Sequence, residues 1–154
     1  METTHQTLTQ IMNLDLSKVK FRLINPQKHG MSGQSADDAI NAFKRFFFLA
    51  GVEGPPLVPT KEIDDVWHEF LMFTLDYEKT CRTLFGKFIH HEPSMGTPEE
   101  TTLMKNAFKR TQELHQKHFN QPYITAYGDC CSGDSCHTCH DQSCCSTDDG
   151  GGGM

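Results

Sequence analysis

Four stretches of the chain carry the spacing of apolar residues that is typical of amphipathic helices. Apolar side chains recur every three or four residues in the stretches 35–50, 60–82 and 97–119, and less regularly in 15–24. This spacing gathers them on one face of a helix, which is then buried against its neighbours. We therefore predict an all-α fold: a small bundle of about four helices.

The first two stretches differ in how well their ends are marked. Residues 15–24 fit a helix that ends before Pro26, although their apolar residues also alternate as in a strand. For 35–50 we predict that Ser35 caps the helix, with Asp38 completing an approximate capping box. Phe48 lies outside the apolar stripe of this helix, so we expect it to contact a second neighbour.

A linker rich in glycine and proline precedes the third stretch, which we expect to form one helix from Thr60 to about residue 82. Asp64 and His68 are four residues apart and lie together at the edge of its apolar stripe. The residues expected to face inward are Ile63, Val66, Trp67, Phe70, Leu71, Phe73, Thr74 and Tyr77.

The fourth stretch has the clearest start signal of the chain. Thr97, Pro98 and Glu100 supply a cap, a first-turn proline and a reciprocal capping carboxylate. Two histidines fall within the apolar arc of this predicted helix. The arc consists of Leu103, Met104, Ala107, Phe108, Thr111 and Leu114, with His115 and His118 among them.

The composition changes at residue 128. Residues 128–154 hold six of the seven cysteines and five aspartates, but no lysine, arginine or large apolar side chain other than the final methionine. Such a segment cannot form a packed core. We predict a helical domain at residues 1–127 and a disordered, flexible Cys/Gly/Asp-rich tail at residues 128–154.

Charge and hydropathy exclude several classes of function. The formal net charge is −6, and nowhere does the chain gather the basic residues that a nucleic-acid backbone requires. No stretch approaches the ~20 apolar residues that span a bilayer, and the N-terminus does not read as a signal peptide. We expect a cytoplasmic protein that binds neither nucleic acid nor membrane; its oligomeric state is left open.

The tail is the first candidate metal site, because clustered thiols in a reducing compartment favour metal binding. Two cysteines form a CxxC motif, which presents two sulfurs to one ion. The candidate ligands are Cys130, Cys131, Cys136, Cys139, Cys144, Cys145, His137 and His140. We predict zinc or copper(I) here, with two alternatives: a tail of reversible disulfides, or a solvated tail without chemistry.

The second candidate cluster lies in the helical domain. Neutral imidazoles bind zinc, and a nearby carboxylate either shares the metal or orients the ring. The candidates are Asp64, His68, His91 with its neighbour His90, His115 and His118. The alternative is structural: a buried hydrogen bond between Asp64 and His68, with the last-helix histidines completing the edge of the core.

These sites lead to three hypotheses about function. The preferred one is a non-enzymatic protein whose tail binds a soft metal, while the helical domain docks an unidentified protein partner. The second is an interaction module with redox-labile or idle cysteines. The third is a small enzyme that uses Cys81 as a nucleophile or a metal held by histidines.

The segment 58–93 resembles the glycine-rich domain-containing protein-like family, which is largely without an assigned activity. The matching residues are Asp64, Trp67, His68, Tyr77, Cys81, Phe85, Gly86, His90, His91 and Pro93. The resemblance implies a small helical domain in which Trp67 anchors the core beside Asp64 and His68. Members usually read Trp-His-x-His, whereas Phe70 stands at the second histidine here. If a metal in the family relies on that histidine, this chain lacks the ligand.

Overall fold

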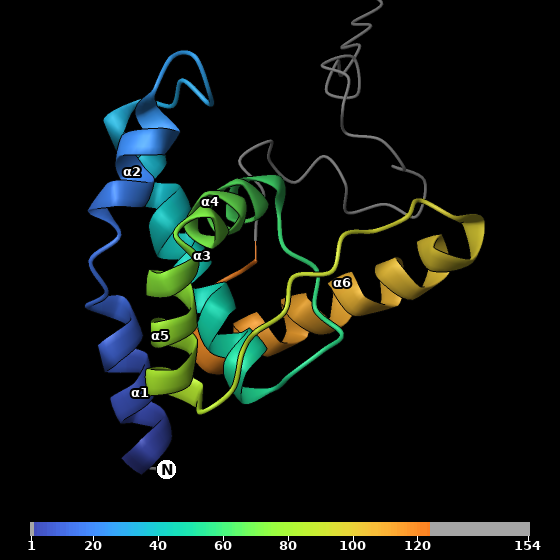
Figure 1. Cartoon of the computed structure of the whole chain (residues 1–154). Helices are drawn as coiled ribbons and strands as arrows, with labels where there is room; N and C mark the ends of the chain where they lie inside the picture. The colour runs from blue at the N-terminus through green and yellow to red at the C-terminus, as the bar shows by residue number, and fades with distance from the viewer. Residues whose placement is uncertain (1, 124–154) are drawn as a thin grey trace, which may run out of the picture. The chain divides into compact units, whose positions relative to one another are not determined.

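The computed structural model describes residues 2–123, which contain six α-helices and no strand (Figure 1). The helices are α1 (Glu2–Met12), α2 (Ser17–Ile24), α3 (Gly33–Val52), α4 (Lys61–Met72), α5 (Thr74–Phe85) and α6 (Pro98–Phe119). The all-α prediction is confirmed for these residues. None of these helices is both long and apolar enough to cross a membrane. The predicted boundary at 127/128 lies outside the described residues.

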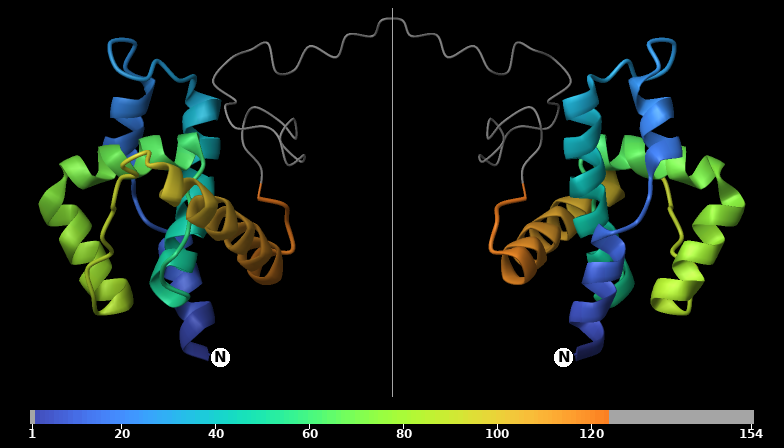
Figure 2. Two further views of the ribbon diagram at one scale, coloured as in Figure 1. Left: turned by 90° about the vertical axis from the view of Figure 1, so that its right-hand side faces the viewer. Right: turned by 90° about the vertical axis from the view of Figure 1, so that its left-hand side faces the viewer.

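The predicted bundle of about four helices is not confirmed, because the described residues form six helices. Helix α3 is the centre of the fold. It contacts α1, α2, α4 and α6, and Figure 2 shows α5 and α6 on opposite sides of it. The reason lies in residues 46–49, which are all buried. Four consecutive residues point to all sides of a helix, so α3 needs neighbours on several sides.

Two helix starts differ from the predictions. Helix α3 begins at Gly33, because the Ser32 hydroxyl, and not that of Ser35, accepts the capping hydrogen bond; its donor is the Ser35 amide at 3.1 Å. Helix α1 was not predicted. Its sequence is mostly polar, and Ile11 alone among its described side chains is fully buried.

The predicted helix 60–82 is in fact two helices. Helix α4 ends at Met72. Phe73 has φ −91° and ψ 67°, and these backbone angles lie outside the helical region, so the helix is interrupted there. Figure 1 shows α4 and α5 running in different directions. The break leaves Thr74 exposed, against the prediction, and turns Tyr77 back into the core, where only 1% of it is exposed.

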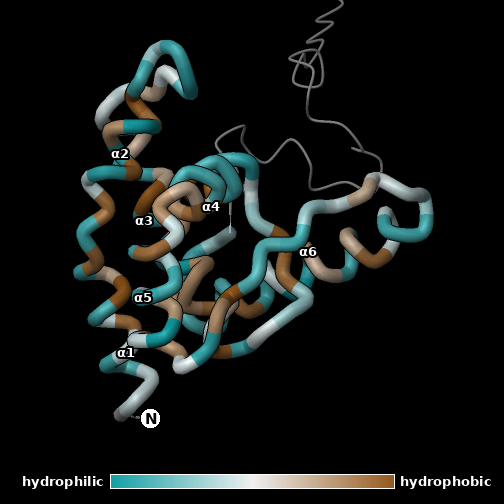
Figure 3. Tube along the Cα trace, in the orientation of Figure 1, coloured by the Kyte–Doolittle hydropathy of each residue, from teal (hydrophilic) through white to brown (hydrophobic). Residues whose placement is uncertain are grey.

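The core is built from aromatic rings of α3, α4 and α5. Trp67 and Phe70 of α4 pack on Phe43 of α3, with ring centroids 6.5 and 6.1 Å apart. Tyr77 of α5 packs on Phe70 at 5.1 Å. Figure 3 shows hydrophobic residues recurring along these helices, as such a core requires. Phe48 forms a separate cluster with Ile11 and Leu49, which confirms that it has a second neighbour.

Helix α6 starts as predicted but is buried over only part of its length. The Thr97 hydroxyl accepts from the Glu100 amide at 3.4 Å, and Glu100 Oε2 accepts from the amides of Met95 and Gly96. Leu103 is 67% exposed, so it does not belong to a buried arc. The first half of α6 extends away from the other helices (Figure 1). The buried residues Ala107, Thr111 and His115 lie further along.

Gly51 gives the first test of this packing. A Cβ atom at Gly51 would lie 2.1 Å from the Phe85 ring, which packs in the core on Phe47. We expect Gly51→Ala to lower the free energy of unfolding by about 1–3 kcal/mol, the usual cost of overpacking. The measurement is urea denaturation. Gly33 is the control: a Cβ there meets nothing within 4 Å, so Gly33→Ala should be neutral or stabilising by up to ~1 kcal/mol. Equal losses in both variants would contradict the packing.

His115 predicts a pH dependence of stability. The ring is buried, its Nδ1 donates to the Gln121 carbonyl at 2.8 Å, and burial lowers its pKa below the ordinary 6.5. Protons therefore bind more readily to the unfolded chain. The stability that this neutral ring contributes is present above pH 6.5 and is lost as the pH falls through the folded-state pKa.

The matched variant is His115→Asn, whose amide retains a donor but does not titrate. Thermal unfolding is followed by circular dichroism at about pH 7.5 and about pH 5.5, on either side of the reference histidine pKa. The Tm of the parent should fall more than that of the variant over this range. If the Tm of the parent and that of His115→Asn fell equally over this pH range, the pKa of His115 would be the same in the folded and unfolded chains.

Candidate metal centre

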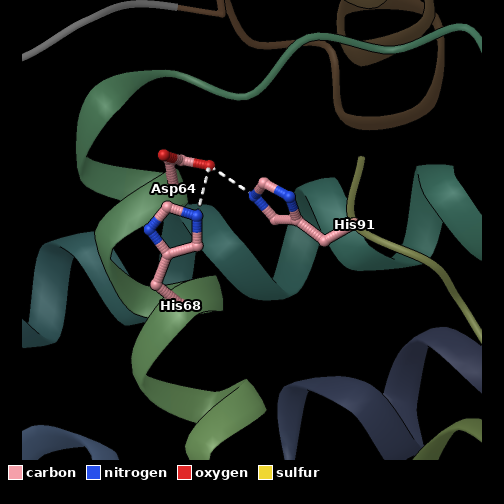
Figure 4. A group of neighbouring side chains, drawn as sticks. All are labelled: Asp64, His68 and His91. Carbon is pink, nitrogen blue, oxygen red and sulfur yellow. Dashed lines mark hydrogen bonds and ion pairs between the residues drawn. The ribbon is translucent and has the colours of Figure 1, made fainter. Parts of the chain in front are cut away.

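Helix α4 places Asp64 and His68 on the same face. The Thr60 hydroxyl caps the helix by accepting from the Ile63 amide at 3.3 Å, so Asp64 falls in the first turn and His68 one turn later. His68 Nε2 lies 3.6 Å from Asp64 Oδ1, and the two are drawn together in Figure 4. The prediction that Asp64 and His68 lie beside each other is confirmed.

The loop between α5 and α6, residues 86–97, brings His91 to the same carboxylate (Figure 4). His91 Nε2 lies 2.6 Å from Asp64 Oδ1, so one oxygen atom faces both imidazoles. The predicted buried hydrogen bond between Asp64 and His68 is wrong. At 3.6 Å the pair is beyond hydrogen-bond range, and the His68 side chain is 53% exposed. The hydrogen bond is made instead by His91, whose side chain is 10% exposed.

Buried contacts of the core hold the loop in this position. Gly86 ends α5 with φ 68°, a conformation that glycine adopts without strain. The Tyr77 hydroxyl then donates to the Ile89 carbonyl, two residues before His91. The His91 ring lies against Trp67, with centroids 4.3 Å apart. The loop is therefore fixed at both its backbone and its functional side chain.

Asp64, His68 and His91 form a group that could hold a metal ion. One potential ligand atom of each residue lies within 4.8 Å of the other two. Zinc bonds of 2.0–2.2 Å in a tetrahedron separate the ligand atoms by about 3.4 Å. The 3.6 Å pair is close to this value, whereas the 2.6 Å hydrogen bond would have to lengthen.

The other predicted ligands of the domain lie elsewhere. His118 Nε2 contacts Glu53 Oε1 at 2.7 Å, and this hydrogen bond lowers the pKa of Glu53. His115 donates to the backbone, as described above, and also packs on the ring of Tyr123 at 5.3 Å. Both complete the edge of the core, as the structural alternative predicted. His90 is exposed beside Phe88.

Phe70 and Cys81 are both core residues. Phe70, where the resemblance implied a lost histidine ligand, is 2% exposed and packs among the aromatic rings. His91 supplies the second imidazole from the loop instead. Cys81 is fully buried, and burial raises the pKa of its thiol. A buried thiol that stays protonated is a poor nucleophile, which argues against the enzyme hypothesis based on Cys81.

The tail candidates lie outside the described residues. They are Cys130, Cys131, Cys136, Cys139, Cys144, Cys145, His137 and His140. Zinc or copper(I) binding by this segment stays a prediction.

The opposite edge of α4 carries a network that the sequence analysis did not identify. Glu69 is 8% exposed and pairs with Arg22 of α2, and its Oε1 contacts His29 Nε2 at 3.0 Å. These hydrogen bonds, together with the positive charge of Arg22, lower the pKa of Glu69 against the opposing effect of its burial. The available signal was the pair Asp65 and Glu69, which repeats the four-residue spacing of Asp64 and His68. The network connects α4 to α2 and to the loop that follows α2.

The comparisons with known proteins correct the family suggested by the sequence. A model of the UCP032817-like family matches residues 6–121, which include the three clustered residues and parts or all of every helix. The resemblance to the glycine-rich domain-containing protein-like family is therefore wrong as an assignment. No curated protein and no solved structure matches the chain. The match covers most of the sequence, and the chain belongs to the UCP032817-like family.

Proposed function

We propose that this protein binds a divalent transition-metal ion, zinc in the first instance, through Asp64, His68 and His91. One observation carries the proposal: ligand atoms from two separate segments of the chain converge within 4.8 Å. Two of the residues come from α4, and the third comes from a loop that follows the next helix. Residues so far apart in sequence meet here because the core fixes both segments.

The chemistry of the three ligands favours zinc over softer or harder ions. Two imidazoles and one carboxylate are borderline ligands, which suit zinc and its neighbours in the first transition row. Magnesium and calcium prefer sites made only of oxygen, and copper(I) prefers thiolates. Zinc in proteins takes four ligands, so a water molecule or an external ligand would complete the shell. The exposed side of His68 leaves room for it.

We propose a binding role for the three residues rather than a catalytic one. Two of the ligands stand on α4 and the third stands on the loop 86–97, so a bound ion would join the helix to the loop. The proposed metal would stabilise this link.

The tail is a second candidate for metal binding, favoured by its CxxC motif and flanking cysteine pairs. The two sites would differ in softness, since the tail offers thiolates and the domain offers nitrogen and oxygen. An experiment on the domain site must therefore remove the thiols of the tail. Protein docking by the helical domain remains part of the proposal, with the partner unidentified.

The test uses the full-length chain with its six tail cysteines changed to serine. Zinc is titrated into this parent protein and the heat of binding is measured by isothermal titration calorimetry. We expect one equivalent to bind. Loss of a direct ligand should cost at least as much as loss of an outer partner, so His91→Ala should weaken binding by about 100-fold or more. His90→Ala removes the exposed neighbouring histidine and should leave the affinity unchanged.

Each other result has a defined meaning. A parent protein that binds no zinc would refute the domain site. Binding by the wild-type chain that disappears with the cysteine-to-serine changes would place the metal in the tail. Equal affinities of His91→Ala and the parent would show that the zinc is held by other residues.

A further inference from the structure

The affinity of the proposed site depends on how firmly the loop holds His91. Asp64 and His68 stand on one helix, whereas His91 comes from residues 86–97, which form no helix or strand. Gly86 and Gly96 near its two ends have φ values of 68° and 72°. If the loop were free, metal binding would have to order it and would lose affinity by that cost.

Tyr77 is the residue that joins the loop to the two helices beside it. Its hydroxyl accepts a hydrogen bond from Trp67 Nε1 at 2.9 Å and donates one to the Ile89 carbonyl. Trp67 in turn lies against the His91 ring. Tyr77, Trp67 and Ile89 are 1%, 6% and 7% exposed, so water does not compete for these bonds.

We propose that Tyr77 is a positioning residue of the metal site, which holds His91 ready for the ion through Ile89 and Trp67 without touching the ion itself. The inference rests on the proposed function, because it concerns the affinity of the same three ligands. Burial raises the pKa of the Tyr77 hydroxyl, which therefore keeps its proton and remains a donor at neutral and moderately alkaline pH. By linkage, metal binding should stabilise the loop as much as the anchored loop favours the metal.

Tyr77→Phe isolates the hydroxyl group. Phenylalanine keeps the ring that packs on Phe70 at 5.1 Å and on Phe88 at 5.2 Å. The change leaves the Ile89 carbonyl and Trp67 Nε1 without their shared partner, while all three ligands remain. Changes in the outer partners of metal ligands typically cost 10–100-fold in affinity, and we expect about tenfold for this indirect contact.

The test compares zinc affinities by calorimetry in the full-length chain whose tail cysteines are serine. Phe48→Leu is the matched control, since Phe48 is buried in the separate cluster with Ile11 and Leu49. Both variants should have a lower Tm than the parent. At a temperature at which both are folded, only Tyr77→Phe should bind zinc more weakly.

A second variant guards against misfolding of Tyr77→Phe. Trp67→Phe keeps an aromatic ring beside His91 but removes the indole N–H that donates to the Tyr77 hydroxyl. This variant should therefore also bind zinc more weakly. Affinities equal to that of the parent in the folded variants, or equal losses in Phe48→Leu, would overturn the inference and leave the proposed function standing. A parent chain that binds no zinc would overturn both.

Discussion

Packing of α4 against α3 is the interaction on which the rest of the structure depends. Trp67 of α4 contacts both Phe43 and Phe46 of α3, with ring centroids 6.5 and 5.5 Å apart. Rings of this size bury large apolar areas and gain a further ~0.5–1.5 kcal/mol per pair from their geometry. Because α4 is fixed in this way, its two edges have fixed orientations. One carries Asp64 and His68, and the other carries Asp65 and Glu69.

The two edges of α4 use similar residues for different purposes. At one edge, Glu69 contacts both Arg22 and His29, and its negative charge is balanced by the guanidinium of Arg22. At the other edge, Asp64 lies beside the imidazoles of His68 and His91, which are residues of the proposed metal site. The guanidinium of Arg22 at the first edge favours the second edge for the proposed ion. A site that already holds a fixed cation has little affinity for another.

The loop 86–97 shows how a core residue reaches the surface site. Tyr77 lies deep in the core and yet makes its hydrogen bond to the backbone segment that presents His91. The break of the helix at Phe73 is what makes this contact, because α5 must turn away from α4 for Tyr77 to reach both Trp67 and Ile89. Architecture and site are therefore coupled through a few buried polar groups rather than through the ligands alone.

The sequence by itself determined the helical class, the starts of α4 and α6, and the placement of Asp64 beside His68 on one helix. Each of these depends on residues a few positions apart, where spacing along a helix dictates contact. The second neighbour of Phe48 was also predictable, since its side chain falls outside the stripe of its own helix.

Only the tertiary structure decided which histidine completes the cluster, where the helix breaks, and which capping serine begins α3. The sequence offered His91, His115 and His118 on equal terms, because nothing local shows which of them will face Asp64. That choice depends on how α5 and its loop fold back on α4, and this is fixed by long-range burial of Tyr77 and Ile89. No local pattern predicts hydrogen-bond partners such as Glu69 and His29, which are 40 positions apart in the sequence.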